Sequence, residues 1–201
     1  LPYNFQKASI LTYVIYLIAR PVTQLYSTPE KSPITSWAYS ILGQIYVVLP
    51  LALLGVWGYK SDYQLFMNTE YLLMALFVFV WTNDTGAYIV GCTLGKHRLF
   101  ERISPKKSWE GFFGGLAFCI ILASLANYII PGMLSTAQWI GMGILTSIFS
   151  TWGDLCESLL KRTAGVKDSG KILPGHGGIL DRFDSELIAS PVIFIYLTFV
   201  L

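Results

Sequence analysis

The stretch Gly111–Ile130, GFFGGLAFCIILASLANYII, decides the fold class of this chain. It contains no Asp, Glu, Lys or Arg, and it has the roughly 20 residues that a helix needs to cross a bilayer. Gly111, Gly114 and Gly115 near its start suit close packing between membrane helices. The stretch therefore predicts a transmembrane helix.

Four more segments resemble membrane spans to varying degrees: Trp37–Tyr59, Tyr71–Cys92, Trp139–Leu160 and Leu187–Leu201. The first has no formal charge, the second contains an Asn-Asp pair, the third stays apolar until Asp154, and the last is short. Ile10–Ala19 is shorter still and fits either an interfacial helix or the remnant of a span. We therefore predict an all-α, polytopic helical membrane protein with about five to six transmembrane helices, in one integral-membrane domain over residues 1–201.

The composition excludes several other classes of protein. Hydrophobic residues make up 54% of the chain and charged residues 13%, whereas soluble domains carry about 25% charged residues. The net charge of +2 is too small to indicate a nucleic-acid partner. The three cysteines are widely spaced and form neither a disulfide framework nor a zinc pattern. We see no signal peptide, and because the chain begins at Leu1 we expect it to be an excerpt with material before it.

The basic residues gather in two loops. One holds Lys96, Arg98, Arg102, Lys106 and Lys107, and the other holds Lys161, Arg162, Lys167, Lys171 and Arg182. The loop between them, PGMLSTAQ, has no basic residue. Because two predicted spans separate the basic loops, both must lie on one face, and the positive-inside rule makes that face cytoplasmic. We expect a polar cavity that opens there.

Carboxylates at membrane depth are the most informative residues. Asp84 and Asp154 lie in or at the ends of apolar segments. A charge at that depth costs at least about 2.5–3.5 kcal/mol on insertion scales, so both side chains are expected to face a polar cavity or a cation. Asp154, Ser158 and Lys161 follow i, i+4, i+7 spacing and therefore share one helical face.

Asp181 and Asp184 lie three residues apart, so on a helix both carboxylates point to the same side. Together with Asp154 they offer hard oxygen ligands in a chain with only two histidines, which favours Mg²⁺ over Zn²⁺. Gly177 and Gly178 let backbone N–H groups approach a phosphate. Counter-charge comes from Lys161, Arg162, Lys167 and Lys171. These features share one predicted face and indicate nucleotide or phosphoryl chemistry in a catalytic domain.

Simpler interpretations remain open on the residues alone. Asp181 and Asp184 also fit an ordinary helix start, because acids favour the first turn, and His176 between glycines fits a turn residue. An ion-coupled transporter would use Asp84 and Asp154 as coupling acids, but it predicts internal repeats that the sequence lacks. A non-catalytic scaffold for anionic headgroups predicts basic residues without paired acids, whereas here acids and bases interleave.

Two motifs resemble a known enzyme family. The stretch Ser158–Asp184, SLLKRTAGVKDSGKILPGHGGILDRFD, resembles the motif of phosphatidate cytidylyltransferases, also called CDP-diacylglycerol synthases. The fixed positions of that motif are met by Ser158, Lys161, Arg162, Lys167, Asp168, Gly170, His176, Gly177, Gly178, Asp181, Arg182 and Asp184. Asn83–Gly111, NDTGAYIVGCTLGKHRLFERISPKKSWEG, is similar to the second polar region of the family.

The resemblance implies transfer of the cytidylyl group of CTP to phosphatidic acid, giving CDP-diacylglycerol and pyrophosphate. The nearest alternative is another lipid nucleotidyl or phosphoryl transferase. The resemblance places Mg²⁺, with or without a second cation, on Asp154, Asp181 and Asp184. It also implies further N-terminal membrane helices, a homodimer, and a bacterial inner membrane with the active site facing the cytoplasm.

Motifs and resemblance together give each candidate residue an expected place. Ser158 completes the coordination shell of the cation, and Asp84 faces the cavity, where Asn83 and Thr85 share hydrogen bonds with it. Phosphate charge is neutralised by Lys161, Arg162, Lys167 and Arg182, with Gly177 and Gly178 as the close-approach turn. The anionic lipid headgroup is drawn by Arg102, Lys106 and Lys107. His176 and Asp168 belong to the same site without a separable role.

Overall fold

The structure is a computed structural model that describes residues 3–26, 32–58, 69–172 and 177–201, with only the backbone described for residues 3–10, 56–58 and 69. It divides into two compact units, Leu1–Val48 and Leu49–Leu201. In the first unit lie α1 (Tyr3–Leu25), α2 (Pro33–Gly43) and the π-helical turn η1 (Gln44–Val48). In the second lie α3 (Leu49–Gly58), α4 (Thr69–Leu94), β1 (Arg98–Phe100), β2 (Ser104–Ser108), α5 (Trp109–Ile129), α6 (Thr136–Thr163) and α7 (Leu180–Val200).

The first unit is held together by polar contacts between α1 and the segment that follows it. The Tyr13 hydroxyl donates to Gln44 Oε1 at 2.6 Å. The Arg20 guanidinium donates to the hydroxyls of Ser36 and Ser40, each at 3.0 Å. The predicted short segment Ile10–Ala19 is therefore part of a longer helix, Tyr3–Leu25, that contains Pro21.

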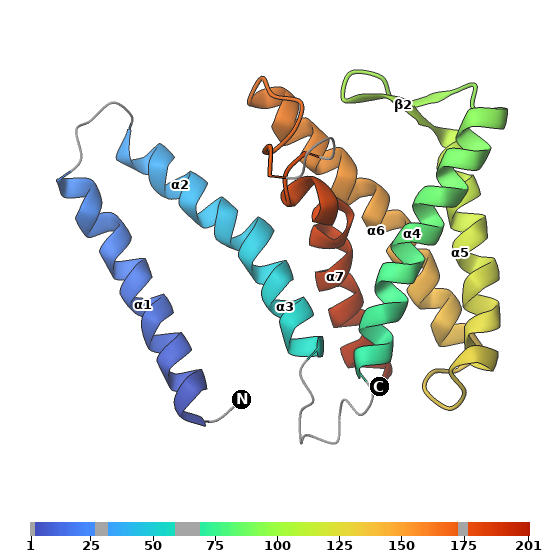
Figure 1. The fold of residues 1–201 in the computed structure, drawn as a ribbon, viewed down its shortest axis with the longest axis horizontal. Coiled ribbons are helices and arrows are strands. Elements are labelled where there is room, and N and C mark those ends of the chain that lie inside the picture. The colour runs from blue at the N-terminus through green and yellow to red at the C-terminus, as the bar shows by residue number, and fades with distance from the viewer. Residues whose placement is uncertain (1–2, 27–31, 59–68, 173–176) are drawn as a thin grey trace. The chain divides into compact units, whose positions relative to one another are not determined.

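The second unit is a helical bundle in which α4 packs on α5, α5 on α6, and α6 on α7 (Figure 1). Buried apolar side chains from all four helices make one core, represented by Leu76, Phe79, Cys119, Trp139 and Ile193. Large apolar side chains also point outward, and Ile121 of α5 is 61% exposed. An apolar exterior around a filled core is what a bilayer requires of a helical membrane protein.

Four helices are long and apolar enough to cross a membrane within the described ranges: Pro33–Gly55, Glu70–Leu94, Trp109–Ile129 and Leu180–Val200. The deciding stretch Gly111–Ile130 is thus confirmed as a helix. The fifth predicted span lies on α6, whose 28 residues have a mixed composition. Its buried face carries Ser147, Ser150 and Thr151, which lower its apolar character although they are not exposed to lipid.

Glycines set the close approach of α4 and α5. A Cβ atom on Gly115 would lie 2.5 Å from Asn83 Oδ1 and 2.7 Å from the Asn83 carbonyl oxygen, and one on Gly114 would collide with Val90. The close contact lets Asn83 reach across to α6, where its Oδ1 accepts a hydrogen bond from Ser147 at 2.6 Å. The prediction that these glycines serve helix packing is confirmed.

Replacing Gly115 by Ala is therefore expected to destabilise the bundle by about 1–3 kcal/mol, because the backbone of α4 must move to admit a methyl group. Thermal unfolding in detergent measures the effect. Gly55→Ala is the matched control, because a Cβ atom there meets nothing within 4 Å. An unchanged melting temperature for Gly115→Ala would contradict the packing role.

A β-hairpin, made of β1 and β2, joins α4 to α5 and is the one described element outside the predicted all-α pattern. The strands pair antiparallel, with Arg98 opposite Ser108. The Glu110 carboxylate secures the base of the hairpin: it accepts backbone N–H groups of Lys96 and His97 and lies 2.6 Å from His97 Nδ1. The hairpin thus starts and ends at the top of α5.

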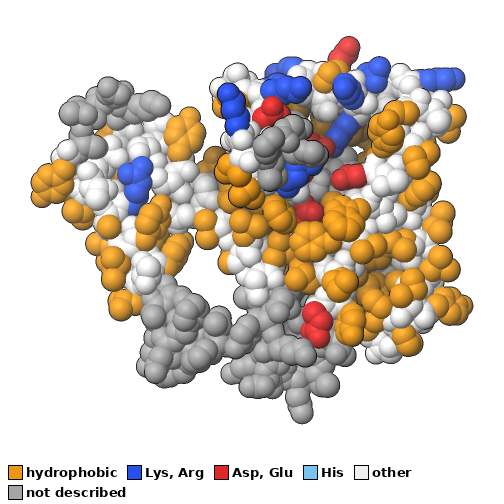
Figure 2. All heavy atoms as spheres, in the orientation of Figure 1, with side chains coloured by type: hydrophobic (Ala, Val, Ile, Leu, Met, Phe, Trp, Pro, Cys, Tyr) orange, Lys and Arg blue, Asp and Glu red, His pale blue; other side chains and the backbone are white. Residues whose placement is uncertain are grey.

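The hairpin, the end of α6 and the start of α7 lie at the same end of the second unit (Figure 1). Figure 2 shows Lys and Arg side chains gathered at that end and apolar side chains along the helices below it. The two basic loops therefore share one face, as the alternation of spans predicted. The same end holds the candidate site.

Candidate active site

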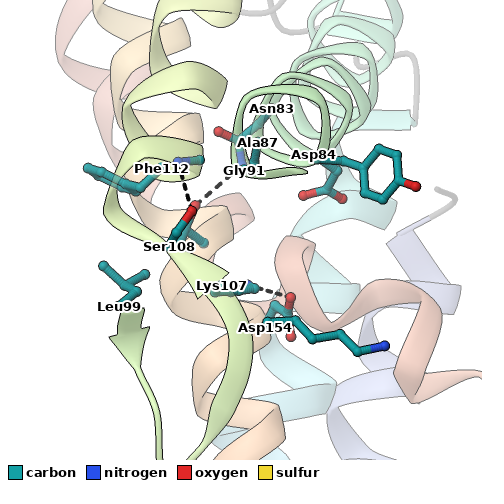
Figure 3. A pocket seen from close by; sticks show the side chains of 13 residues that line it. Asn83, Asp84, Ala87, Gly91, Leu99, Lys107, Ser108, Phe112 and Asp154 are labelled. Carbon is teal, nitrogen blue, oxygen red and sulfur yellow. Dashed lines mark hydrogen bonds and ion pairs between the residues drawn. The ribbon is translucent and has the colours of Figure 1, made fainter. Parts of the chain in front are cut away.

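Asp154 lies near the end of α6 and is contacted from two directions. Lys107 Nζ, carried by β2, lies 2.5 Å from Asp154 Oδ2 (Figure 3). The Ser158 hydroxyl, one turn further along α6, donates to Asp154 Oδ1 at 3.2 Å. The predicted shared face of Asp154 and Ser158 is confirmed. Lys107, which we expect to attract the lipid headgroup, contacts a carboxylate of the predicted cation site in this structure.

Asp181, in the first turn of α7, organises the segment between α6 and α7. Its carboxylate accepts the backbone N–H and the hydroxyl of Ser169 at 2.9 and 2.8 Å, and the backbone N–H of Gly178 at 2.7 Å. Lys161 Nζ lies 2.8 Å from Asp181 Oδ1. Hydrogen bonds from charged and backbone donors are the strong ones, so this carboxylate fixes the loop to the helix.

The two glycines before α7 leave room for that carboxylate. Gly177 has φ +79°, in the left-handed region that favours glycine, and a Cβ atom on it would lie 2.6 Å from Asp181 Oδ2. A Cβ atom on Gly178 would collide with Ser169 Oγ and lie 2.8 Å from the Gly170 nitrogen. Both glycines are therefore needed for close approach. In this structure the N–H of Gly178 points at Asp181.

Asp184, one turn beyond Asp181 on α7, has different surroundings. Its Oδ1 accepts the N–H of Ser185 at 2.6 Å. Its charge interacts with those of Asp154 on α6 and Asp84 on α4. Three helices thus bring carboxylates toward one region. The two carboxylates of the i, i+3 pair on α7 therefore have different partners. Asp181 binds the loop before α7, whereas Asp184 interacts with the acids of the neighbouring helices.

A cavity of about 270 Å³ opens beside these acids, between α4, β2, α5 and α6 (Figure 3). Polar groups from three elements line it: Asp84, Lys106, Lys107, Ser108 and Asp154. The rest of its wall combines apolar or small residues with three further polar side chains, and comprises Ala87, Gly91, Leu99, Gly111, Phe112, Asn83, Tyr88 and Thr151. The prediction that Asp84 faces a polar cavity is confirmed. The neighbouring Asn83 directs its amide N–H groups to Ser150 and Thr151 of α6, at 3.2 and 3.3 Å.

Glu157 is the residue that the sequence pattern did not place in the site. It is 1% exposed, and Lys161 Nζ lies 2.5 Å from its Oε2. Lys161 therefore lies between two carboxylates, those of Glu157 and Asp181. The i, i+4 spacing of an acid and a lysine was the available signal, but such pairs are common on exposed helix faces and do not by themselves indicate burial.

The remaining candidates lie on the elements that carry this centre or in the segments next to them. Arg102 is in the hairpin turn, and Arg162 is in the last turn of α6. Lys167 and Asp168 lie in the segment that follows α6, and all four side chains are exposed. Arg182 is exposed on the first turn of α7. His176 lies outside the described residues.

Several of the predicted cation ligands lie at this end of the bundle. Among the described residues, no three His, Cys, Asp or Glu side chains converge closely enough to hold a metal ion. The available ligands are nevertheless hard oxygens, from Asp154, Asp181, Asp184 and Ser158, which suit Mg²⁺. Lysine ammonium groups balance two of these carboxylates, since Lys107 contacts Asp154 and Lys161 contacts Asp181. The ligand types therefore suit a divalent cation, whereas their positions do not bring three of the carboxylates together within the described residues.

Fold and site together define an integral membrane protein with an acid–lysine site at one end of a helical bundle. The chain belongs to the Cytidylyltransferase family, whose match covers residues 2–200. It is 41% identical over 160 residues to a phosphatidate cytidylyltransferase of Staphylococcus aureus (strain COL), covering 79% of this chain and 61% of the relative. Proteins of the same name from Staphylococcus haemolyticus and Staphylococcus epidermidis are 41% and 40% identical over 159 residues, with the same coverage. The chain thus spans 61% of the length of these relatives.

Proposed function

We propose that this protein transfers the cytidylyl group of CTP to phosphatidic acid, giving CDP-diacylglycerol and pyrophosphate. Membership of the Cytidylyltransferase family and the names of the relatives support this activity. The observation that carries it in the structure is the Lys107–Asp154 ion pair inside the cavity. It brings a basic hairpin and an acidic helix together where a phosphate and a cation would both need partners.

The transfer reaction requires that the two substrates be positioned and that the negative charge of their phosphates be neutralised. A phosphate oxygen of phosphatidic acid attacks the α-phosphorus of CTP, the bond from that phosphorus to the pyrophosphate oxygen breaks, and pyrophosphate leaves with the electron pair. No covalent intermediate on the protein is required, so the rate depends on holding two anions together and on stabilising the charge that develops. The basic face of this site supplies that stabilisation.

Individual side chains divide this work. Lys107 lies at the cavity and neutralises phosphate charge beside Asp154. Lys161 does the same at the start of α7, where it contacts Asp181. Asp154, Asp181 and Asp184 would hold Mg²⁺, which supplies further charge neutralisation for the phosphates when bound. Ser158 orients the Asp154 carboxylate through its hydrogen bond.

The activity is tested with the protein purified in detergent and supplied with Mg²⁺, labelled CTP and a panel of lipid acceptors. We expect label in a lipid product only with phosphatidic acid, together with one pyrophosphate released per labelled lipid. If the label were transferred to diacylglycerol or to another lipid phosphate instead, the protein would be a different lipid transferase and this proposal would be wrong. Absence of any labelled lipid would refute nucleotidyl transfer.

We also propose that the site faces the cytoplasm from the bacterial inner membrane. The basic residues gathered at the site end support this orientation, because positively charged loops are retained on the cytoplasmic side.

The orientation predicts which positions an impermeant maleimide can label in intact cells. In a variant lacking Cys92, Cys119 and Cys156, a cysteine introduced as Ser135→Cys should be labelled from outside. Glu101→Cys, in the hairpin turn, should be labelled only after the membrane is permeabilised. The opposite pattern would invert the proposed topology.

A further inference from the structure

The Glu157 carboxylate of α6 is buried, and the charged group beside it is the ammonium of Lys161. Its side chain is 1% exposed, and Lys161 Nζ lies 2.5 Å from Oε2. Within the described residues, neither oxygen receives a hydrogen bond from any other group. A buried carboxylate without a compensating charge is strongly unfavourable, and the ammonium of Lys161 is the compensating charge beside Glu157.

The same ammonium reaches the loop-binding acid. Lys161 Nζ lies 2.8 Å from Asp181 Oδ1, and Asp181 in turn accepts hydrogen bonds from Ser169 and Gly178. A line of contacts therefore runs from the interior of α6 to the loop before α7. Glu157 lies at its buried end, and the loop at its open end.

A second carboxylate matters because a lysine side chain is flexible. An ammonium on a four-carbon stem is strongly hydrated and leaves a site readily unless it is held. If Asp181 binds a cation, its attraction for Lys161 weakens. Glu157 remains one helical turn from Lys161, and no other donor in the described structure binds its carboxylate. Glu157 would then keep Lys161 directed toward an incoming phosphate.

We infer that Glu157 is a positioning residue that holds Lys161 at the phosphates of CTP. This inference rests on the proposed function and extends it to a residue that does not touch the substrate. Glu157 is too buried to contact a nucleotide directly, so its effect must pass through Lys161.

The inference predicts a specific kinetic change in Glu157→Gln. A variant that merely folds poorly loses active molecules and lowers the apparent kcat, but leaves both KM values unchanged. Loss of Lys161 positioning instead weakens binding of the CTP phosphates. We therefore expect the KM for CTP to rise about tenfold, as for loss of a charge-assisted hydrogen bond, with the KM for phosphatidic acid unchanged.

Three further variants sharpen the test. Glu157→Asp keeps the charge and should restore part of the CTP affinity. Lys161→Gln should raise the KM for CTP at least as much, and adding Glu157→Gln to it should cause no further rise, because both act through one group. Glu186→Gln, which removes another buried carboxylate of the bundle, is the matched control and should leave the KM for CTP unchanged.

A readout independent of catalysis separates this inference from the proposed function. Amine labelling followed by mass spectrometry should show faster modification of Lys161 in Glu157→Gln than in the wild type, with the exposed Lys171 as internal reference. An unchanged labelling rate, or an unchanged KM for CTP, would overturn the positioning role. If the wild type formed no cytidylyl lipid, the proposed function would fail and the labelling rate alone would decide the role of Glu157.

Discussion

Cytidylyl transfer is expected to fall at least about 100-fold when Asp154 is replaced by Asn, because the change removes one negative charge from the centre of the site. An Asn side chain still offers an oxygen to the Ser158 hydroxyl, so α6 keeps its local geometry. What is lost is the charge opposite Lys107 and the proposed ligand for the cation. The initial rate at saturating CTP and phosphatidic acid measures the loss.

Cation binding gives this prediction a second measurement. Bound Mn²⁺, used in place of Mg²⁺ and counted by electron paramagnetic resonance, should decrease in Asp154→Asn. Glu101→Gln is the control, because it removes an exposed acid from the hairpin turn outside the cavity. Normal turnover together with normal Mn²⁺ binding in Asp154→Asn would eliminate Asp154 from the site.

Asp181→Asn should cause a loss of similar size, at least about 100-fold in kcat, and should also loosen the loop before α7. The amide cannot accept from Lys161, Ser169 and Gly178 as the carboxylate does, because half of its hydrogen-bonding capacity is now a donor. The loop should then be cut faster by trypsin after Lys167 and Lys171, which are exposed.

The proteolysis pattern distinguishes Asp181 from Asp154. Within the described residues, Asp154 contacts Lys107 and Ser158 and no residue of that loop. Asp154→Asn should therefore leave tryptic cleavage at the wild-type rate. Equal cleavage in Asp181→Asn and the wild type would show that the carboxylate is not what fixes the loop.

Much of the bundle was predictable, because apolar runs such as Gly111–Ile130 have few alternatives to a membrane helix. The start of α7 was less so. The apolar run suggested Leu187, but the helix begins at Leu180, since its first turns carry Asp181 and other polar residues that face the site. The simpler interpretation of Asp181 as part of a helix start was therefore correct for the backbone.

Contacts within one helix were also predictable, and those between elements were not. The spacing of Asp154 and Ser158 places them on one face, and the structure joins them. The pairing of Lys107 with Asp154 depends on how the hairpin folds over α6, which no spacing along the chain encodes. Glu157 was missed because burial, not sequence distance, separates it from an ordinary surface acid.

The joint between the hairpin and α5 constrains how such a chain can vary over evolution. Ser108 ends β2, caps α5 through Gly111 and lines the cavity next to Lys107, with no spacer residue between strand and helix. One inserted residue there would shift the register between the strand and the helix and displace Lys107 from Asp154. Insertions at the hairpin turn leave that registration intact, so length variation among functional descendants should concentrate at residues 101–103 and avoid the joint.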